Sequence, residues 1–272
     1  MRHSLAVFLL LTLTACGMFS PLPDGSSQNT KSRPAEEIYA DAKEKFDEGS
    51  YSDAIKLYEA LQSRYPYGRY AQQSMLEMAY AYYRQNEPDP AISTADRFIK
   101  QFPNNPHVDY AYYVKGLANF NGEIGVLASI GGQDPTERDP QSALDAFNAF
   151  RDLVTRFPNS KYTPDAKVRM QYLSNALAKH ELHVAEYYLR RGANIAAVNR
   201  AQDLIKTYPN SPSTRAALEI MVQAYDAMGM TDLRDDTKRV LAQNVGASAA
   251  PGKAAAPLAD SRPEKSWWQF WK

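Results

Sequence analysis

An aromatic residue followed directly by proline recurs four times in this 272-residue chain, and no other feature constrains the fold as strongly. An alanine stands twelve residues before each proline. The four sets are Ala54 with Tyr65-Pro66, Ala91 with Phe102-Pro103, Ala146 with Phe157-Pro158, and Ala197 with Tyr208-Pro209. Proline is excluded from a helix interior, so each pair is expected just after the end of a helix. The chain between the pairs therefore holds a repeated helical unit.

Glycines and small residues at matching positions extend the repeat upstream. Gly49 and Gly192 come five residues before Ala54 and Ala197, where the chain must turn between two helices. Small residues also stand where the first helix of a unit must approach its partner, at Ala42, Ala79, Gly116 and Ala185. The whole pattern resembles tetratricopeptide (TPR) repeats, which are helix-turn-helix units of about 34 residues.

Apolar residues recur with helical spacing, and no run alternates with period two over the length of a strand. A fifth unit keeps Tyr225 and Gly229 but lacks the alanine and the proline, as is common for a terminal repeat. The expected helices are 35–47, 51–64, 69–85, 88–101, 106–121, 139–156, 161–190, 194–206, 211–228 and 231–244. We predict an all-α fold over 35–244: a right-handed superhelical solenoid of about five TPR repeats with ten helices.

The segment 121–141 interrupts the third unit with the sequence NGEIGVLASIGGQDPTERDPQ. It contains four glycines and two Asp-Pro steps. A loop of this length inside a compact domain is usually functional or disordered.

The first sixteen residues have the layout of an export signal. A positive start precedes an apolar run that is too short to span a bilayer, and Leu13-Thr14-Ala15-Cys16 matches the bacterial lipobox. Cys16 is the only cysteine of the chain, so it cannot form an internal disulfide, and lipidation explains its presence. We expect a signal peptide at 1–15, a diacylglycerol-modified Cys16, and a flexible tether at 16–34. Gly17 follows the cysteine where inner-membrane lipoproteins commonly have aspartate, which favours the periplasmic face of the outer membrane.

Composition and motifs argue against catalysis and against nucleic acid as a partner. The 31 basic and 31 acidic residues balance, so no overall positive charge attracts nucleic acid. His180 and His183 stand three residues apart on an expected helix, but without HExxH spacing or a nearby third ligand they do not make a metal site. No serine stands in a pattern with a histidine and an acid. We therefore expect neither an enzyme nor a bound cofactor.

The first helices of the first three units carry many aromatic residues. In a TPR stack these helices line a concave surface, which is where such proteins usually bind peptides. The candidate peptide-binding residues are Tyr39, Phe46, Gln73, Leu76, Tyr80, Tyr83, Tyr110 and Tyr113. The alternative for each of them is core packing between helices, and the sequence leaves that choice open.

Several short motifs together resemble the BamD/ComL family of outer-membrane β-barrel assembly lipoproteins. They are Tyr65-Pro66-Tyr67-Gly68, Asp96-Arg97-Phe98-Ile99, Asp109-Tyr110, Lys115-Gly116-Leu117, Arg138-Asp139-Pro140, Ala185-Glu186-Tyr187-Tyr188, Arg191-Gly192-Ala193 and Asn199-Arg200. The resemblance covers about 34–244 and implies a non-catalytic component of the Bam complex. It implies that repeats at 35–160 bind unfolded outer-membrane β-barrel proteins, whose carboxy-terminal signal typically ends in an aromatic residue. It also implies that repeats at 161–244 dock a periplasmic domain of BamA and other Bam lipoproteins.

The fourth unit holds the candidate docking residues, Tyr187, Arg190, Arg191, Asn199 and Arg200. Arginines are costly to bury unpaired, so acids within the fold or acids on a partner should meet them. The resemblance favours a partner. Two rival functions remain: a pilotin-like TPR lipoprotein scaffold for secretin or cell-envelope assembly, and a cell-wall enzyme or its activator.

The segment 245–272 forms a second low-complexity tail, and it ends in Ser266-Trp267-Trp268-Gln269-Phe270-Trp271-Lys272. All three tryptophans of the chain lie there. Tryptophan favours the membrane interface, which is the receptor that the sequence suggests first. A partner, or the peptide-binding surface of the chain itself, is the alternative.

Overall fold

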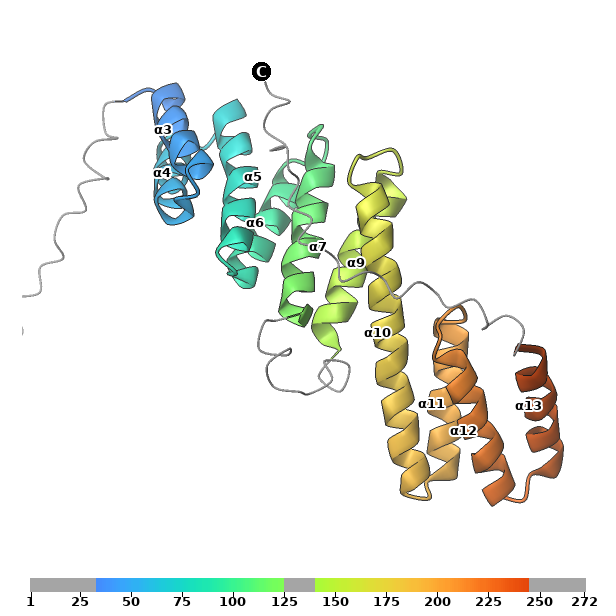
Figure 1. The fold of residues 1–272 in the computed structure, drawn as a ribbon. Coiled ribbons are helices and arrows are strands. Elements are labelled where there is room, and N and C mark those ends of the chain that lie inside the picture. Colours follow the sequence, from blue (N-terminus) through green and yellow to red (C-terminus); the bar gives the residue numbers. More distant parts are fainter. Residues whose placement is uncertain (1–32, 125–139, 245–272) are drawn as a thin grey trace, which may run out of the picture. The chain divides into compact units, whose positions relative to one another are not determined.

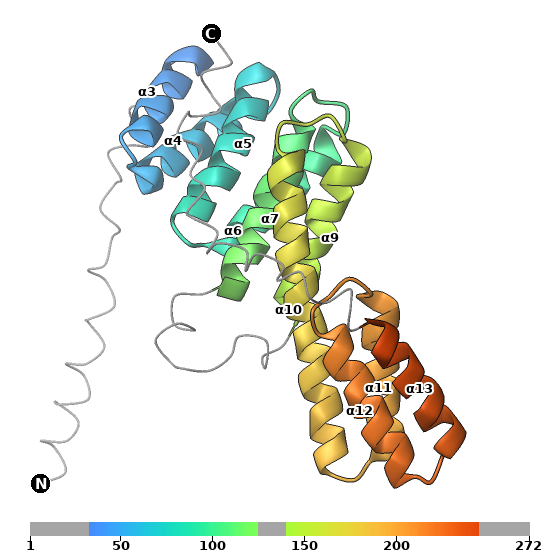
Figure 2. The same ribbon diagram turned by 45° about the vertical axis from the view of Figure 1, so that its right-hand side comes forward.

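The computed structural model describes residues 33–124 and 140–244, which fold into α-helices without a strand (Figures 1 and 2). The ten helices of these residues are α3 (Ala35–Asp47), α4 (Tyr51–Arg64), α5 (Arg69–Arg84), α6 (Pro88–Gln101), α7 (Val108–Ile124), α9 (Gln141–Arg156), α10 (Thr163–Arg190), α11 (Asn194–Thr207), α12 (Thr214–Ala227) and α13 (Thr231–Asn244). The signal peptide, Cys16, most of the tether, the larger part of the insertion and the Trp-rich tail lie outside the described residues. The all-α prediction with helix pairs is confirmed.

The chain divides into two compact units, one up to Gln85 and the other from Asn86 onward. The first unit contains α3, α4 and α5, and the second contains α6 to α13. The predicted change of role after residue 160 falls inside the second unit, between α9 and α10, and stays a prediction.

Each aromatic-proline pair stands immediately after the second helix of its repeat. The amide of the aromatic residue still donates to the carbonyl four residues earlier: Tyr65 to Leu61 at 2.7 Å, and Phe102 to Phe98, Phe157 to Leu153 and Tyr208 to Leu204 at 2.8 Å. The aromatic residue then leaves the helical region, because the following proline disfavours helical backbone before it. All four acceptor residues are fully buried.

The predicted close approaches between helices are present. The alanines twelve residues before each proline have no exposed surface, and Ala42, Ala79 and Ala185 are equally buried. Gly116 of α7 is the tightest case, since a Cβ added there would lie 2.4 Å from Cε1 of Phe150 on α9. The turns at Gly49 and Gly192 use φ of 81° and 74°, which glycine adopts without strain.

Helix ends match the predicted ranges within a few residues, and the largest differences are at α7 and α12. Helix α7 continues to Ile124, three residues beyond its expected end, because a single glycine costs a helix only about 1 kcal/mol. None of the described helices is long and apolar enough to cross a membrane.

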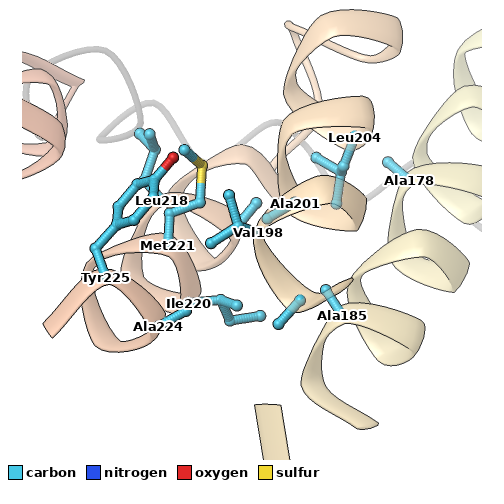
Figure 3. Packing of buried hydrophobic residues seen from close by; sticks show 12 residues of the cluster. Ala178, Ala185, Val198, Ala201, Leu204, Leu218, Ile220, Met221, Ala224 and Tyr225 are labelled. Carbon is cyan, nitrogen blue, oxygen red and sulfur yellow. The ribbon is translucent and has the colours of Figure 1, made fainter. Parts of the chain in front are cut away.

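The core of the second unit extends along the repeats. Buried residues of α10, α11 and α12 form one cluster that includes Ala185, Val198, Leu204 and Met221 (Figure 3). Helix α10 has 28 residues and packs against α9, α11 and α12. It therefore joins the third and fourth helix pairs without a break.

Candidate functional site

Four of the predicted peptide-binding residues lie together in the first unit, in a cluster of aromatic rings. Ring centroids are 6.0 Å apart for Tyr39 and Tyr58, 6.5 Å for Tyr58 and Phe46, 5.9 Å for Phe46 and Tyr80, and 5.9 Å for Tyr80 and Tyr83. We call these five residues the aromatic cluster. It connects α3, α4 and α5, and Tyr58 of α4 is a member that sequence reasoning missed.

Burial separates the members of this predicted surface. Phe46 and Leu76 are each 1% exposed and Tyr80 is 6% exposed, so these side chains fill the interior. Tyr39, Gln73 and Tyr83 are only partly buried. Helical spacing cannot distinguish the two classes, because a groove-facing stripe and an interhelix stripe lie next to each other on the same helix. Phe46, Leu76 and Tyr80 therefore follow the core-packing alternative that the sequence left open, and a role of these residues in peptide binding stays a prediction.

Cationic side chains border the aromatic cluster. The guanidinium of Arg84 lies 5.8 Å from the ring centre of Tyr80 and donates to its hydroxyl at 3.1 Å. The amine of Lys43 lies 4.9 Å from the ring centre of Phe46. Arg84 is exposed, so it places a positive charge at the edge of an otherwise aromatic region.

A buried carboxyl group lies beneath the cluster. Glu77 of α5 is fully buried, and it accepts hydrogen bonds from Tyr39 at 2.9 Å and from Tyr58. Burial raises the pKa of Glu77 to about 7, against the lowering effects of Lys43 and the two tyrosine donors. The same burial, together with the neighbouring carboxyl group, raises the pKa of both tyrosines. An acid within the apolar run Met75–Ala81 is the signal that could have revealed this group from the sequence.

Tyr110 and Tyr113 belong to the second unit and pack inside it. They are 4% and 7% exposed, and their ring centroids lie 5.3 and 4.7 Å from that of Tyr162. Tyr113 also donates to Asp165 on α10 at 2.8 Å. The core-packing alternative thus describes both side chains in this structure, and their part in peptide binding stays a prediction.

The predicted docking residues are exposed, as a partner-binding surface requires. Tyr187 is 46% exposed, and Asn199 is exposed on α11. Arg191 lies against Tyr187, with its guanidinium 5.4 Å from the ring centre and its Nε and Nη2 donating to the hydroxyl at 3.2 and 3.1 Å. We call Tyr187, Arg190, Arg191, Asn199 and Arg200 the docking surface.

Acids within the fold meet two of its arginines. Arg200 lies 3.3 Å from Glu181 on α10, and Arg190 lies 3.9 Å from Glu186. The Arg200 and Arg190 side chains remain 46% and 68% exposed. Exposed pairs of this kind contribute only about 0–1 kcal/mol, so a partner carboxylate can replace either acid at little cost.

An open depression adjoins the docking surface along the last turns of α10. Its volume is about 580 Å³, and its lining includes His180, Val184, Tyr188 and Arg190. The second histidine, His183, lies 3.7 Å from Glu186. Among the described residues, no three histidine, cysteine or acidic side chains come together as metal ligands.

Comparison with known proteins decides the family. A model of the YfiO family, described as an outer membrane lipoprotein, matches residues 31–240. The chain belongs to the YfiO family. Curated proteins similar to this chain include the "Outer membrane protein assembly factor BamD" of Neisseria meningitidis serogroup A, 42% identical over 267 residues that cover 98% of each chain. The protein of the same name from Vibrio cholerae is 38% identical over 211 residues, which cover 78% of this chain and 88% of that one.

The sequence motifs indicated a resemblance to the BamD/ComL family, and these matches confirm it for this YfiO family member.

Solved structures of lower similarity were also found. The crystal structure of MamA protein is 18% identical with a TM-score of 0.33, covering 78% of this chain and 91% of that one. The crystal structure of kinesin light chain TPR-like repeats from Podosopora anserina is 14% identical with the same TM-score, covering 81% and 98%.

Proposed function

We propose that this chain is a non-catalytic lipoprotein component of the β-barrel assembly machinery, binding BamA and unfolded outer-membrane proteins at the outer membrane. Family membership and the assembly-factor name of its relatives support this role. The lipobox ending at Cys16 supports a lipid anchor with the repeats on the periplasmic face. Other Bam lipoproteins are further expected partners.

The observation that carries the BamA contact is the docking surface. Arginine and tyrosine are the residue types that most often dominate binding energy in protein interfaces. Here Tyr187, Arg190, Arg191 and Arg200 are exposed, the first two beside a depression along α10, and Arg190 and Arg200 pair with partly exposed glutamates. An acidic, partly apolar face of a BamA periplasmic domain would complement this surface.

The aromatic cluster supports the contact with unfolded substrates. Tyr39 and Tyr83 keep part of their rings accessible, and exposed Arg84 lies beside Tyr80. A peptide that ends in an aromatic residue offers a ring for the tyrosines and a carboxylate for the guanidinium. The first unit thus combines both groups that such a signal requires.

Charge reversal at Arg200 tests the BamA contact, with Arg215 as its matched control. Both arginine side chains are 46% exposed and each pairs with one glutamate, Arg200 with Glu181 and Arg215 with Glu219. Arg200→Glu should sharply reduce the BamA that co-purifies from detergent-solubilised membranes, whereas Arg215→Glu should not. Helical content and melting temperature should stay unchanged in both variants. Equal BamA recovery with the two variants would disprove the proposed contact, and loss of melting temperature in Arg200→Glu alone would make the pair with Glu181 structural.

A further inference from the structure

The last three described helices form a small, open apolar pocket that the proposed function does not use. Its volume is about 310 Å³, and Ile205 of α11, Leu218 and Met221 of α12, and Val240 of α13 line it. Leu218 and Met221 lie at one edge of the core cluster, beside Tyr225 (Figure 3). The volume is at the lower end of the roughly 300–1,000 Å³ range of ligand pockets, so it suits a single large side chain.

Helix α13 leaves apolar side chains uncovered beside this pocket. Val240 and Leu233 are 45% and 47% exposed, and Met230, directly before the helix, is 43% exposed. Thr237 is the only residue of α13 that is buried. Helix α13 therefore carries an apolar face that the other described residues cover only in part.

The rim of the pocket carries one charge of each sign. Lys206 and Asp236 belong to its lining, and α13 also carries Asp232 and Asp235. A lysine over the face of an aromatic ring gains a cation–π contact, and a carboxylate can accept the N–H of an indole. Both features favour tryptophan over an aliphatic occupant.

The chain itself supplies such an occupant close by. After Asn244 it continues through a Pro-, Ala- and Gly-rich segment to Trp267, Trp268 and Trp271, the three tryptophans of the sequence. A linker of this length and composition has an r.m.s. span of roughly 26 Å, and Val240 is one helical turn before the point of departure. Tethering at that range gives an effective concentration on the order of millimolar.

We propose that a tryptophan of this tail binds in the pocket between α11, α12 and α13 of its own chain. The pocket then serves as an indole-binding site, and the bound tryptophan covers Val240 and the other apolar side chains of its lining. The sequence alone suggests the membrane interface as the binding site of the tail. We assign the tail instead to this pocket, which is closer along the chain. It does not rest on the proposed role in barrel assembly.

Tryptophan fluorescence tests the proposal directly, because every tryptophan of the chain lies in the tail. The sample is the chain from residue 16 with Cys16→Ser, which omits the lipid and keeps all described residues. Its emission should be blue-shifted and its acrylamide quenching several-fold weaker than for a free peptide of residues 260–272. Both properties should be independent of protein concentration, as binding within one chain requires.

A matched pair of variants locates the site. Val240→Lys places a charge in the pocket, whereas Leu233→Lys places one on the same helix, at similar exposure, outside the pocket lining. Val240→Lys should shift emission and quenching to the values of the free peptide, and Leu233→Lys should leave them as in the parent chain. A photoreactive residue at position 240 should crosslink to a fragment that contains residues 266–272, which keeps the test valid if Val240→Lys lowers stability.

Several outcomes would overturn the proposal. Emission of the parent chain equal to that of the free peptide would mean that the tail is in water. Blue emission that persists in Val240→Lys would mean that another surface holds it, and dependence on concentration would mean binding between chains. A blue shift that appears only with vesicles of phosphatidylethanolamine and phosphatidylglycerol would assign the tail to the membrane.

Discussion

Tyr39 donates a hydrogen bond to Glu77 across 38 residues of sequence, with 2.9 Å between the phenolic oxygen and Oε1. The bond connects the first helix of one repeat to the first helix of the next. Because Glu77 is fully buried, the state of this bond depends on whether its carboxyl group carries a charge.

The stability of the first unit should fall as the pH rises from about 4.5 to about 7. Burial raises the pKa of Glu77 from 4.5 to about 7 in the folded chain, so the folded state binds a proton more tightly than the unfolded state over that range. Its stabilising contribution is complete below the unfolded pKa and is lost as the pH passes the folded pKa. The expected loss is on the order of 2–3 kcal/mol. Urea unfolding followed by circular dichroism at several pH values measures it.

Two glutamine variants isolate this effect from the other acids. Glu77→Gln should flatten the pH dependence and should be more stable than the parent chain at pH 8. Glu59→Gln is the control, because Glu59 also accepts from a tyrosine, Tyr82, but at an exposed position. If both variants keep the slope of the parent chain, the buried carboxyl group is not its source.

Gly116→Ala should destabilise the second unit by about 1–3 kcal/mol, the usual cost of overpacking a core. The added Cβ would lie 2.4 Å from the ring of Phe150, which has no exposed surface. Thermal melting of the single variants and of Gly116→Ala with Phe150→Leu measures the coupling. The two costs should add to more than the cost of the double variant, and strict additivity would show that α7 and α9 adjust without strain.

Cys16→Ser should release the protein from the outer membrane or leave it unprocessed, because it removes the only thiol that can carry a lipid. Fractionation after a high-salt wash measures the location, in cells that lack the partner proteins. Retention of the variant in the outer-membrane fraction under those conditions would mean that another feature anchors the chain.

A photoreactive group at Tyr83 should crosslink a peptide that ends in phenylalanine, with alternating apolar residues before it, more strongly than a scrambled peptide. Tyr83 is only partly buried, whereas Tyr80 is 6% exposed, so labelling through position 80 should be weaker. Arg84→Ala should reduce labelling if the guanidinium holds the terminal carboxylate. Equal labelling by the two peptides would assign these tyrosines to the core alone.

The repeat pattern predicted the helices because it depends on local chemistry. Proline after Tyr65 and glycine at position 49 fix helix ends through backbone geometry, which no later packing overrides. The prediction at Gly116 was also correct, because a position without a side chain in the repeat pattern indicates that two helices pack closely there.

The binding surfaces were harder to predict, because exposure depends on residues far apart in sequence. Tyr80 and Tyr113 follow the same helical spacing as groove-facing residues, yet α3 and α10 provide the neighbours that bury or bond them. Arg200 shows the converse, because an acid within the fold was one of its two expected partners, but the sequence did not indicate Glu181, which is 19 residues away. Sequence periodicity identifies the face of a helix but not which neighbour covers it.

Because α10 is one continuous helix, a residue inserted into it or deleted from it moves everything that follows. Inserting or deleting one residue within a helix rotates everything beyond it by about 100° and shifts it by about 1.5 Å. Tyr187 and Arg190 lie in the last turn of α10, whereas Asp165 and Arg169, near its start, pair at 2.6 Å beside α7 and α9. A single-residue deletion between these two ends would therefore rotate the docking surface relative to the third repeat while leaving every residue of that surface in the sequence. If the surface binds a partner as proposed, the spacing along α10 determines that binding as much as the identity of the arginines does.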